Sequence, residues 1–553
     1  MSPTVFAGRV AAPGTALGFA YRTDRAHREV LPRRNLGDPR TQITEAFDAV
    51  SNAMRELAES LRARGQAEQA DIMETASYLA DDRDLRDTAI DHARNGDPVT
   101  VAIGKAVDWH ATALSLLDDP MLAERATDVR QVGKRALAFL HRDPGAEPGA
   151  GQEGPLVLLG HEIGAADLLE AHAPVVAAAS VTGGPNSHAA IVARSLGIPL
   201  ILGIEPAALE GPDGVEILID GDTLTIRPEP DRRDAALEAM AAAHARRTAL
   251  LAGRDLPSET TDGHPVVLRA NIATPADAAN ALAAHADGVG LLRTELPFLD
   301  ATTWPSRLQH LAVLTPILRR LEGKPVTVRT LDYADDKLPP FLAAGREGGR
   351  LGRGLPLMLA EPGAFAEQFR AILTAGAATE LRIMIPMVAN VEELRACRKL
   401  LDEAAVEVGV EPVPLGAMIE LREAVEDIEA IAAEADFCSI GSNDLTCQLL
   451  GLDRRDPAAS PAMAADPRVL QAISDVVVAA HRHRRPVSVC GDAAAHPQVV
   501  PLLIGLGVDI LSVAPAALDE TRAGIRGLDY LNCVELAAAA ITRSGDPCQR
   551  REC

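Results

Sequence analysis

Short β-like runs alternate with helical segments from about Val266 onward, and this alternation constrains the fold more than any other feature. It extends over about 290 residues. The runs are VVLRANI, GVGLLRTE, PVTVRTLD, LPLMLA, LRIMIPMV, PLGAMIE, FCSIGSNDL, PVSVCGDA and DILSVAP. Such alternation predicts a parallel (β/α)₈ barrel. Nine runs stand where eight strands are needed, so either LPLMLA or DILSVAP is not a barrel strand.

The part of the chain before the barrel has two textures. Residues 1–22 hold short β-like runs separated by Pro-Gly, whereas apolar residues from about Thr41 to Leu140 recur every three or four positions. That spacing predicts amphipathic helices joined by short turns, as in a bundle. The expected helices cover 42–64, 66–80, 84–94, 98–117 and 120–141. After the Gly/Pro-rich stretch 143–155, β-like runs return, which indicates a helical block inserted into an α/β domain.

We therefore expect four parts. The first is a discontinuous α/β domain formed by 1–22 and 146–228, and the second is the helical domain of 23–145. A linker helix occupies 229–255, and residues 256–553 form the barrel. A chain of 553 residues is too long for one ordinary core, which agrees with several domains.

Charge and composition exclude several classes of protein. The chain has 54 Lys and Arg against 78 Asp and Glu, a net charge of −24. This charge argues against broad binding to nucleic acid or to an anionic membrane surface. The sequence contains no uninterrupted run of about 18 apolar residues, the length that would predict a membrane-spanning helix. The seven cysteines contain no CxxC pair, so a zinc ribbon or a secreted disulfide framework is not expected, and we expect a cytoplasmic protein.

The sharpest local signal is the string SVTGGPNSHAAIVARSLGIPLILG at 180–203. A strand ends at Val181, and Gly183 and Gly184 allow an unusual turn. His188 stands where the helix AAIVARSL begins. A helix start offers unsatisfied N–H groups and a partial positive charge, which suit a phosphate carried on that histidine. An isolated histidine here would merely cap the helix, but within this string we predict a phosphorylated residue.

Chemically reactive residues also follow several barrel strands. They are Arg293 after GVGLL, Arg329 in PVTVR, Glu420 after GAMI, Asn443 and Asp444 after FCSIGS, and Cys490 after PVSV. The carboxyl ends of the strands of such a barrel converge on one mouth, where active sites lie. Arginines bind carboxylates and phosphates through paired donors, and carboxylates are the hard oxygen ligands that Mg²⁺ prefers. Because the whole chain is acidic, a site for an anionic ligand must be locally basic.

The string around His188 resembles the phosphohistidine loop of the phosphoenolpyruvate-utilising family. In that family a Gly-Gly-x-Thr-Ser-His run carries the phosphoryl group; Ser187 and His188 match, and Asn186 replaces the usual Thr. Within the family, nearly the whole chain is similar to the enzyme I proteins of the bacterial sugar phosphotransferase system. The pieces run in family order: VAAPGTALG at 10–18, LAERATDVRQVGKR at 122–135, the His188 loop, GLLRTE, VRTLD, RIMIPMV, GSNDLT and CGDAA.

The resemblance implies a multidomain α/β fold, in which a swivelling phosphohistidine domain with an inserted helical bundle precedes the (β/α)₈ barrel. It implies that phosphoenolpyruvate phosphorylates His188, that the group passes to the phosphocarrier protein HPr on the helical domain, and that pyruvate leaves. Mg²⁺ is the implied cofactor, with a homodimer formed through the barrel. The implied substrate-binding residues are Arg293, Arg329, Arg353, Asn443, Asp444 and Arg454; the metal ligands are Glu420 and Asp444; and the acid that protonates the enolate is Cys490.

Some positions depart from the family pattern. Leu421 and Arg422 follow the metal-binding glutamate, 334–337 reads ADDK instead of Gly-Gly-Asp-Lys, Pro356 replaces a common arginine, and Cys447 replaces a frequent Gln. The departures around Glu420 leave open a non-catalytic regulator that binds phosphoenolpyruvate. A phosphoryl donor to a related non-sugar phosphotransferase chain is a further alternative. A phosphoenolpyruvate synthase or pyruvate phosphate dikinase would need an ATP-binding domain, and no GxxxxGK[ST] loop occurs here.

Overall fold

The computed structural model describes residues 3–23, 37–63, 67–116, 120–141, 154–169, 173–185, 187–333, 339–343, 354–453 and 460–542. Contacts divide the chain into two compact units, Met1–Arg246 and Arg247–Cys553. Asn186, Arg353, Arg454 and the segment 334–338 fall outside the described residues.

The first unit contains a mixed sheet of eight strands in the order β1-β8-β7-β3-β4-β5-β6-β2. Strands β3 to β6 run parallel, and the others join them antiparallel. The bounds are β1 (Thr4–Ala7), β2 (Arg9–Ala12), β3 (Thr15–Arg22), β4 (Leu156–Gly160), β5 (Val175–Ser180), β6 (Leu200–Leu202), β7 (Glu216–Asp220) and β8 (Thr223–Ile226). Strands from before and after the helical block therefore share one sheet, as expected of an insertion.

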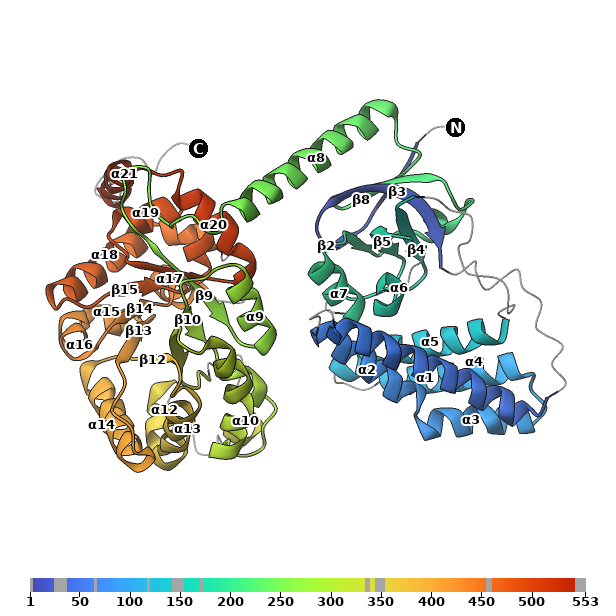
Figure 1. The fold of residues 1–553 in the computed structure, drawn as a ribbon, viewed down its shortest axis with the longest axis horizontal. Helices are drawn as coiled ribbons and strands as arrows, with labels where there is room; N and C mark the ends of the chain where they lie inside the picture. The colour runs from blue at the N-terminus through green and yellow to red at the C-terminus, as the bar shows by residue number, and fades with distance from the viewer. Residues whose placement is uncertain are drawn as a thin grey trace. The chain divides into compact units, whose positions relative to one another are not determined.

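The inserted block is a bundle of five helices, as the apolar periodicity predicted (Figure 1). They are α1 (Pro39–Ala63), α2 (Ala67–Ala80), α3 (Arg83–Arg94), α4 (Val99–Ser115) and α5 (Pro120–His141). The bundle lies on the side of the sheet that carries α6 (Ala165–Leu169) and α7 (His188–Leu196). One continuous hydrophobic core joins the bundle, these two helices and the sheet; it includes Phe47, Ile103, Leu158 and Val192.

Helix α8 (Pro230–Ala252) follows the sheet and contains the point in the chain where the two units divide. Only Ala236 of its side chains is buried. Helix α8 thus occupies most of the range 229–255 in which a linker helix was expected, and most of its side chains are not buried.

The second unit is a closed barrel of eight parallel strands, which confirms the prediction from the alternating pattern. The strands are β9 (Val267–Ile272), β10 (Val289–Leu292), β11 (Pro325–Arg329), β12 (Glu380–Ile385), β13 (Leu415–Ile419), β14 (Cys438–Ile440), β15 (Val487–Val489) and β16 (Ile510–Val513). Between the strands and after them lie α9 (Pro275–Ala283), α10 (Arg307–Leu318), α11 (Pro340–Ala343), α12 (Leu355–Ala360), α13 (Pro362–Ala375), α14 (Val391–Val408), α15 (Arg422–Glu426), α16 (Ile428–Glu434), α17 (Ser442–Leu450), α18 (Pro467–Arg482), α19 (Val500–Gly505), α20 (Leu518–Ile525) and α21 (Tyr530–Thr542).

The question of the ninth run is settled by its secondary structure. LPLMLA is helix α12, which begins after Gly354, whereas DILSVAP supplies β16 and closes the barrel against β9. Gly354 has a φ of 64°, a left-handed conformation that favours glycine. A buried apolar run of six residues looks alike as a strand or as a helix, so the sequence pattern could not distinguish them.

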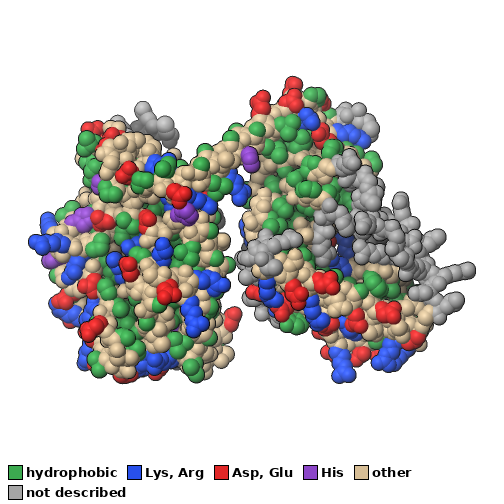
Figure 2. Space-filling model, in the orientation of Figure 1, with side chains coloured by type: hydrophobic (Ala, Val, Ile, Leu, Met, Phe, Trp, Pro, Cys, Tyr) green, Lys and Arg blue, Asp and Glu red, His purple; other side chains and the backbone are tan. Residues whose placement is uncertain are grey.

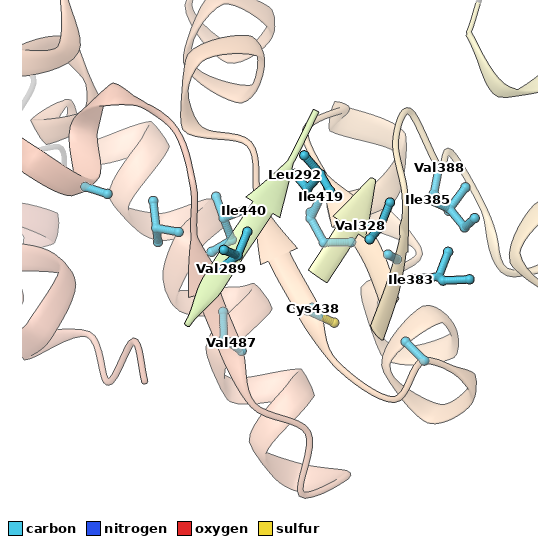
Figure 3. Close-up of a cluster of buried hydrophobic side chains, with 14 of the residues drawn as sticks. Val289, Leu292, Val328, Ile383, Ile385, Val388, Ile419, Cys438, Ile440 and Val487 are labelled. Carbon is cyan, nitrogen blue, oxygen red and sulfur yellow. The ribbon is translucent and has the colours of Figure 1, made fainter. Parts of the chain in front are cut away.

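The barrel wall is stabilised by aliphatic side chains that pack between the strands and the surrounding helices. Figure 3 shows several of them, including Leu292 on β10, Val328 on β11, Ile419 on β13 and Ile440 on β14. All four are fully buried. Inside the barrel, a separate small cluster holds Leu291, Met384, Met418, Phe437 and Cys490. The interior is therefore filled by side chains, as in other barrels of this kind.

The surface of the barrel carries charges of both signs. On the face drawn in Figure 2, Lys and Arg side chains are interspersed with Asp and Glu side chains over the barrel. Among the described helices, none combines the length and the hydropathy that a membrane crossing requires.

Candidate active site

The first candidate group, His188, is the first residue of α7. Ser187 caps this helix, because its hydroxyl accepts a hydrogen bond from the Ala190 backbone N–H at 3.4 Å. Gly197 ends the helix with a φ of 67°, the left-handed conformation typical of a glycine C-cap. Local sequence thus places the imidazole at a helix N-terminus, where the positive end of the helix dipole favours an anion.

The loop before His188 is held by the helix that follows it. The guanidinium of Arg194 donates to the carbonyl of Pro185 at 2.8 Å and to that of Ala11 on β2 at 3.0 Å. Gly183 has a φ of 134°, which other residues rarely adopt, so the turn predicted at this glycine is present. The imidazole therefore sits on a rigid helix start and not on an unanchored loop.

An acidic partner for His188 comes from helix α5 of the bundle. One carboxylate oxygen of Asp128 lies 3.0 Å from Nδ1 of His188, and the other lies 3.2 Å away. A carboxylate beside Nδ1 favours the tautomer that carries its proton there, so Nε2 is the basic nitrogen. The imidazole is 35% exposed, which leaves it accessible to a partner. Asp128 belongs to the ERATDVRQVGKR stretch, but the 60 residues between it and His188 concealed the contact.

We expect Asp128→Asn to slow the proposed phosphorylation of His188 by roughly 10- to 100-fold, the effect known for the loss of a carboxylate that orients a metal-bound histidine. The amide keeps the size of the side chain but no longer favours the proton on Nδ1. The rate of labelling by a phosphoryl donor and the ¹⁵N shifts of the imidazole check this prediction. A change of rate without a change of tautomer population would contradict the assigned role.

The second set of candidates lies in the barrel, at the carboxyl ends of five strands. Arg329 is the last residue of β11. Arg293, Glu420 and Cys490 directly follow β10, β13 and β15, respectively. Asn443 and Asp444 are in the first turn of α17, just after β14. Because all the strands are parallel, these side chains meet at one end of the barrel. These side chains are close enough to influence one another, because the charges of Glu420, Arg329 and Arg293 all shift the pKa of the Cys490 thiol.

Arg329 is buried between two carboxylates. Its guanidinium lies 2.7 Å from Oε1 of Glu295 and 2.7 Å from Oδ2 of Asp332. Burial disfavours the charged guanidinium, but the charges of Asp332, Glu295 and Glu420 outweigh burial and raise the pKa of Arg329. Neither Glu295 nor Asp332 was a candidate from the sequence, although they are the last residues of the motifs GLLRTE and VRTLD. Arg329 is therefore a permanently charged and firmly held cation.

Two guanidinium N–H groups at this mouth lack an acceptor in the protein. The Nε atoms of Arg293 and Arg329 are buried and have no hydrogen-bond partner among the described residues. A buried donor without an acceptor costs about 1–3 kcal/mol, so each such group requires an explanation, of which a bound ligand, ion or water is one. An anion with several oxygens would supply the missing acceptors.

Glu420 is a buried carboxyl group, 1% exposed. Its Oε1 accepts a hydrogen bond from the Met387 backbone N–H at 2.7 Å. Burial, together with the charges of Asp332 and Asp444, raises the pKa of Glu420 to about 8. Gly441 makes room for this group, because a Cβ there would lie 2.7 Å from Oε2 of Glu420.

Cys490 is 4% exposed and lies in the apolar cluster inside the barrel. Burial raises the pKa of its thiol to about 11, and the charge of Glu420 acts in the same direction. Arg329 and Arg293 oppose this shift but do not cancel it. The thiol therefore keeps its proton at neutral pH. A general acid needs that proton, whereas a cysteine nucleophile would have to lose it.

Asn443 is tied to the loop that follows Cys490. Its Nδ2 donates to Oδ2 of Asp492 at 3.0 Å, and its Oδ1 accepts from the Asp492 backbone N–H at 3.0 Å. Each of these two bonds links the end of β14 to the end of β15. The amide is thus oriented by Asp492, a residue that the sequence did not single out.

The described part of the barrel mouth does not test the expectation of a locally basic site. Among the described residues, the carboxylates of Glu295, Asp332, Glu420 and Asp444 stand against the guanidinium groups of Arg293 and Arg329. The predicted cations Arg353 and Arg454 lie outside the described residues. The described part of the site is therefore acidic, because two carboxylates already neutralise Arg329.

This surplus of carboxylates fits a bound divalent cation. The structure places Glu420 close enough to Asp444 for the two charges to repel, and Oδ1 of Asp332 is buried without a hydrogen-bond partner among the described residues. Those residues contain no group of three or more His, Cys, Asp or Glu side chains arranged around one metal position. Mg²⁺ needs only one or two carboxylates, with substrate oxygens and water completing its shell. The residues present therefore fit Mg²⁺.

Family models match most of the chain. The model described as "PEP-utilising enzyme, PEP-binding domain" matches residues 248–530. Those described as "PEP-utilising enzyme, N-terminal" and "PEP-utilising enzyme, mobile domain" match 7–125 and 152–224.

The curated relatives described here carry two different names. A multiphosphoryl transfer protein of Xanthomonas campestris pv. campestris is 35% identical over 96% of this chain and 64% of its own length. One from Rhodobacter capsulatus is 37% identical over 80% of this chain and 56% of its own length, so the chain spans less than two thirds of these two relatives. A phosphoenolpyruvate-protein phosphotransferase of Geobacillus stearothermophilus is 31% identical over 94% of this chain and 93% of its own length.

Proposed function

We propose that this chain, which belongs to the family of phosphoenolpyruvate-utilising enzymes, transfers the phosphoryl group of phosphoenolpyruvate to its own His188. It then passes the phosphoryl group to the phosphocarrier protein HPr and releases pyruvate, as the first step of sugar uptake by a phosphotransferase system. The observation that carries this proposal is His188 itself, an accessible imidazole at a helix start whose Nδ1 faces Asp128.

The phosphoryl step uses His188 as the nucleophile. Nε2 attacks the phosphorus of phosphoenolpyruvate in line with the bridging oxygen; the N–P bond forms as the P–O bond breaks, and the bond electrons go to the enolate of pyruvate. Such transfer depends on positioning and on charge neutralisation more than on covalent help from the protein. The buried Nε–H groups of Arg293 and Arg329 support a role in binding the phosphate and carboxylate oxygens.

The enolate then takes a proton at its methylene carbon, and Cys490 supplies it. A thiol whose pKa is raised by burial to about 11 holds its proton until a stronger base forms, as the enolate does. Solvent reprotonates the thiolate afterwards. Asn443, oriented by Asp492 two residues beyond the thiol, donates to the substrate from the remaining N–H of its amide.

The proposed cofactor is Mg²⁺, held by Glu420 and Asp444. When bound, it would neutralise negative charge on the phosphate, and it would also relieve the repulsion that raises the pKa of Glu420. By family likeness, Arg353 and Arg454 are proposed as further contacts to the phosphate. A homodimer formed through the barrel is proposed on the same ground.

HPr is the proposed acceptor, and the helical bundle is its proposed docking surface. In support, the bundle exposes the large apolar side chains of Tyr78, Trp109 and Leu116, which are 61%, 62% and 78% exposed. Exposed aromatic residues are enriched where proteins meet.

We expect Glu420→Gln to raise the Mg²⁺ concentration for half-maximal pyruvate formation by roughly tenfold or more, because a neutral amide replaces an anionic ligand. Asp444→Asn should behave alike. Titration of Mg²⁺ against the rate of pyruvate formation measures the effect. Both variants should still accept phosphate on His188 from phospho-HPr, a step that does not use the barrel. An unchanged Mg²⁺ dependence in both would remove the metal assignment.

The proposed function is tested by incubating the purified chain with ³²P-phosphoenolpyruvate and Mg²⁺. Without HPr, we expect one acid-labile phosphate per chain and a single equivalent of pyruvate. With excess HPr, label should pass to HPr and pyruvate should form continuously. A chain that binds phosphoenolpyruvate but never becomes labelled would instead be a regulator.

A further inference from the structure

We infer that Gln368, a residue of helix α13 outside the barrel mouth, is a positioning residue for Arg329. This inference rests on the proposed function, since it concerns how the arginine is held for phosphoenolpyruvate. Gln368 is 0% exposed, although glutamine is rarely buried so completely. A buried amide must find hydrogen-bond partners, and its partners lie in the loops that follow two barrel strands.

The amide of Gln368 connects the loops after β10 and β11. Its Nε2 donates to the hydroxyl of Thr294 at 3.1 Å, and its Oε1 accepts from the backbone N–H of Leu331 at 3.0 Å. The hydroxyl of Thr294 in turn donates to the carbonyl of Arg329 at 2.9 Å. Gln368 thus restrains the backbone of Arg329 indirectly, through Thr294. It also restrains the backbone of Leu331, two residues later, by a direct hydrogen bond.

The two restrained positions are the neighbours of the two acidic partners of Arg329. Thr294 precedes Glu295, and Leu331 precedes Asp332. Those carboxylates each lie 2.7 Å from the guanidinium of Arg329. In addition, the backbone N–H of Thr294 donates to Oε2 of Glu295 at 3.1 Å, which orients that carboxylate. Gln368 therefore determines where both acceptors stand, and through them where the guanidinium points.

The chemistry of the bonds is specific to an amide. The single hydroxyl proton of Thr294 goes to the carbonyl of Arg329, so Thr294 can only accept from residue 368, while the N–H of Leu331 needs an acceptor there. A side chain at 368 must donate and accept at once. Methionine has similar length but does neither well, so Gln368→Met removes the bonds while filling the space.

The test compares Gln368→Met with Ile372→Val, a change one helical turn along α13 at another fully buried position, which loses packing but no bond of this network. We expect Gln368→Met to raise the KM for phosphoenolpyruvate by roughly 10- to 100-fold with a smaller change in kcat, because a misplaced arginine binds ground state and transition state less well. Ile372→Val should keep the wild-type KM, and both variants should accept phosphate from phospho-HPr on His188 at the wild-type rate.

Thr294→Val interrupts the same chain of bonds and serves if Gln368→Met does not fold. Where both fold, the double variant should show the larger single effect and not the product of the two, because both act on one network. A wild-type KM in Gln368→Met, or effects that multiply, would overturn the inference. Failure of the proposed function is distinguishable, because then the wild-type chain itself shows neither labelling nor heat of binding with phosphoenolpyruvate.

Discussion

Replacing His188 with alanine will abolish labelling of the chain by phosphoenolpyruvate, because in the proposed reaction one imidazole nitrogen carries the whole phosphoryl group. The fold should survive, since the imidazole is 35% exposed and alanine favours a helix start no less than histidine does. The measurement is acid-labile ³²P per chain, read beside thermal unfolding of the same variant. We expect labelling to fall below detection while the unfolding temperature stays near that of the wild type.

The matched control is His110→Ala. His110 is a half-buried histidine of the same unit, on helix α4, and its Nε2 lies 3.3 Å from the hydroxyl of Thr88. This variant should be labelled like the wild type. An acid-labile phosphate that persists on the His188→Ala chain would show that another residue is the acceptor. Loss of label in both variants would point to damage of the bundle and not to the loss of a nucleophile.

The second large effect concerns Cys490. Cys490→Ala should slow steady pyruvate formation by a factor on the order of 10²–10⁴, the usual contribution of a general acid. Phosphoenolpyruvate binding should change far less, and single-turnover labelling of His188 should persist, since the phosphoryl step needs no thiol. Cys490→Ser should not restore the rate, because a hydroxyl is a much weaker acid. Pyruvate formation and histidine labelling, measured together, separate the two steps.

Cys438 offers a control of matched burial. It is a fully buried cysteine of strand β14 that packs in the hydrophobic core of the barrel wall (Figure 3). Cys490 belongs to the separate cluster inside the barrel. Cys438→Ala removes a buried thiol of the same size and should cost similar stability without slowing pyruvate formation. Wild-type turnover in Cys490→Ala would reduce that cysteine to a packing residue.

The pH profile gives an independent measure of the same role. The protonated thiol is the active form in the proposed mechanism, and burial raises the pKa of Cys490 to about 11. Its contribution is therefore present throughout the neutral range and is lost only as the pH rises through about 11. We expect no loss of pyruvate formation attributable to this group below about pH 10. A basic limb near the ordinary thiol pKa that disappears in Cys490→Ala would mean that the thiol is not buried during turnover.

Much of the architecture followed from local patterns. Apolar spacing predicted the five helices of the bundle, and alternation predicted the eight-stranded barrel, because both patterns reflect which face of each element is buried. The position of His188 at a helix start also follows from its neighbours, since Ser187 caps that helix and Gly197 ends it. Residues that end parallel strands of a barrel necessarily share its mouth, so the grouping of Arg329, Glu420 and Cys490 needed only the strand assignments.

Contacts between distant segments could not be derived in this way. Asp128 meets His188 across 60 residues, and Gln368 reaches Thr294 across 74. Which side chain fills a given space depends on how helices pack against the sheet or barrel, and the local spacing of residues carries no record of that packing. The same reason left LPLMLA undecided between strand and helix, because its apolar run is compatible with both.

The sequence by itself thus determined the elements, their order and the chemical groups that the barrel mouth and the start of helix α7 present. These depend on hydrophobic periodicity, capping and strand direction, all of which are local. Only the tertiary structure decided the state of those groups. Burial keeps the Cys490 thiol protonated, Glu295 and Asp332 hold Arg329, and Asp128 sets the tautomer of His188. Desolvation and charge depend on distance in space and not on distance along the chain.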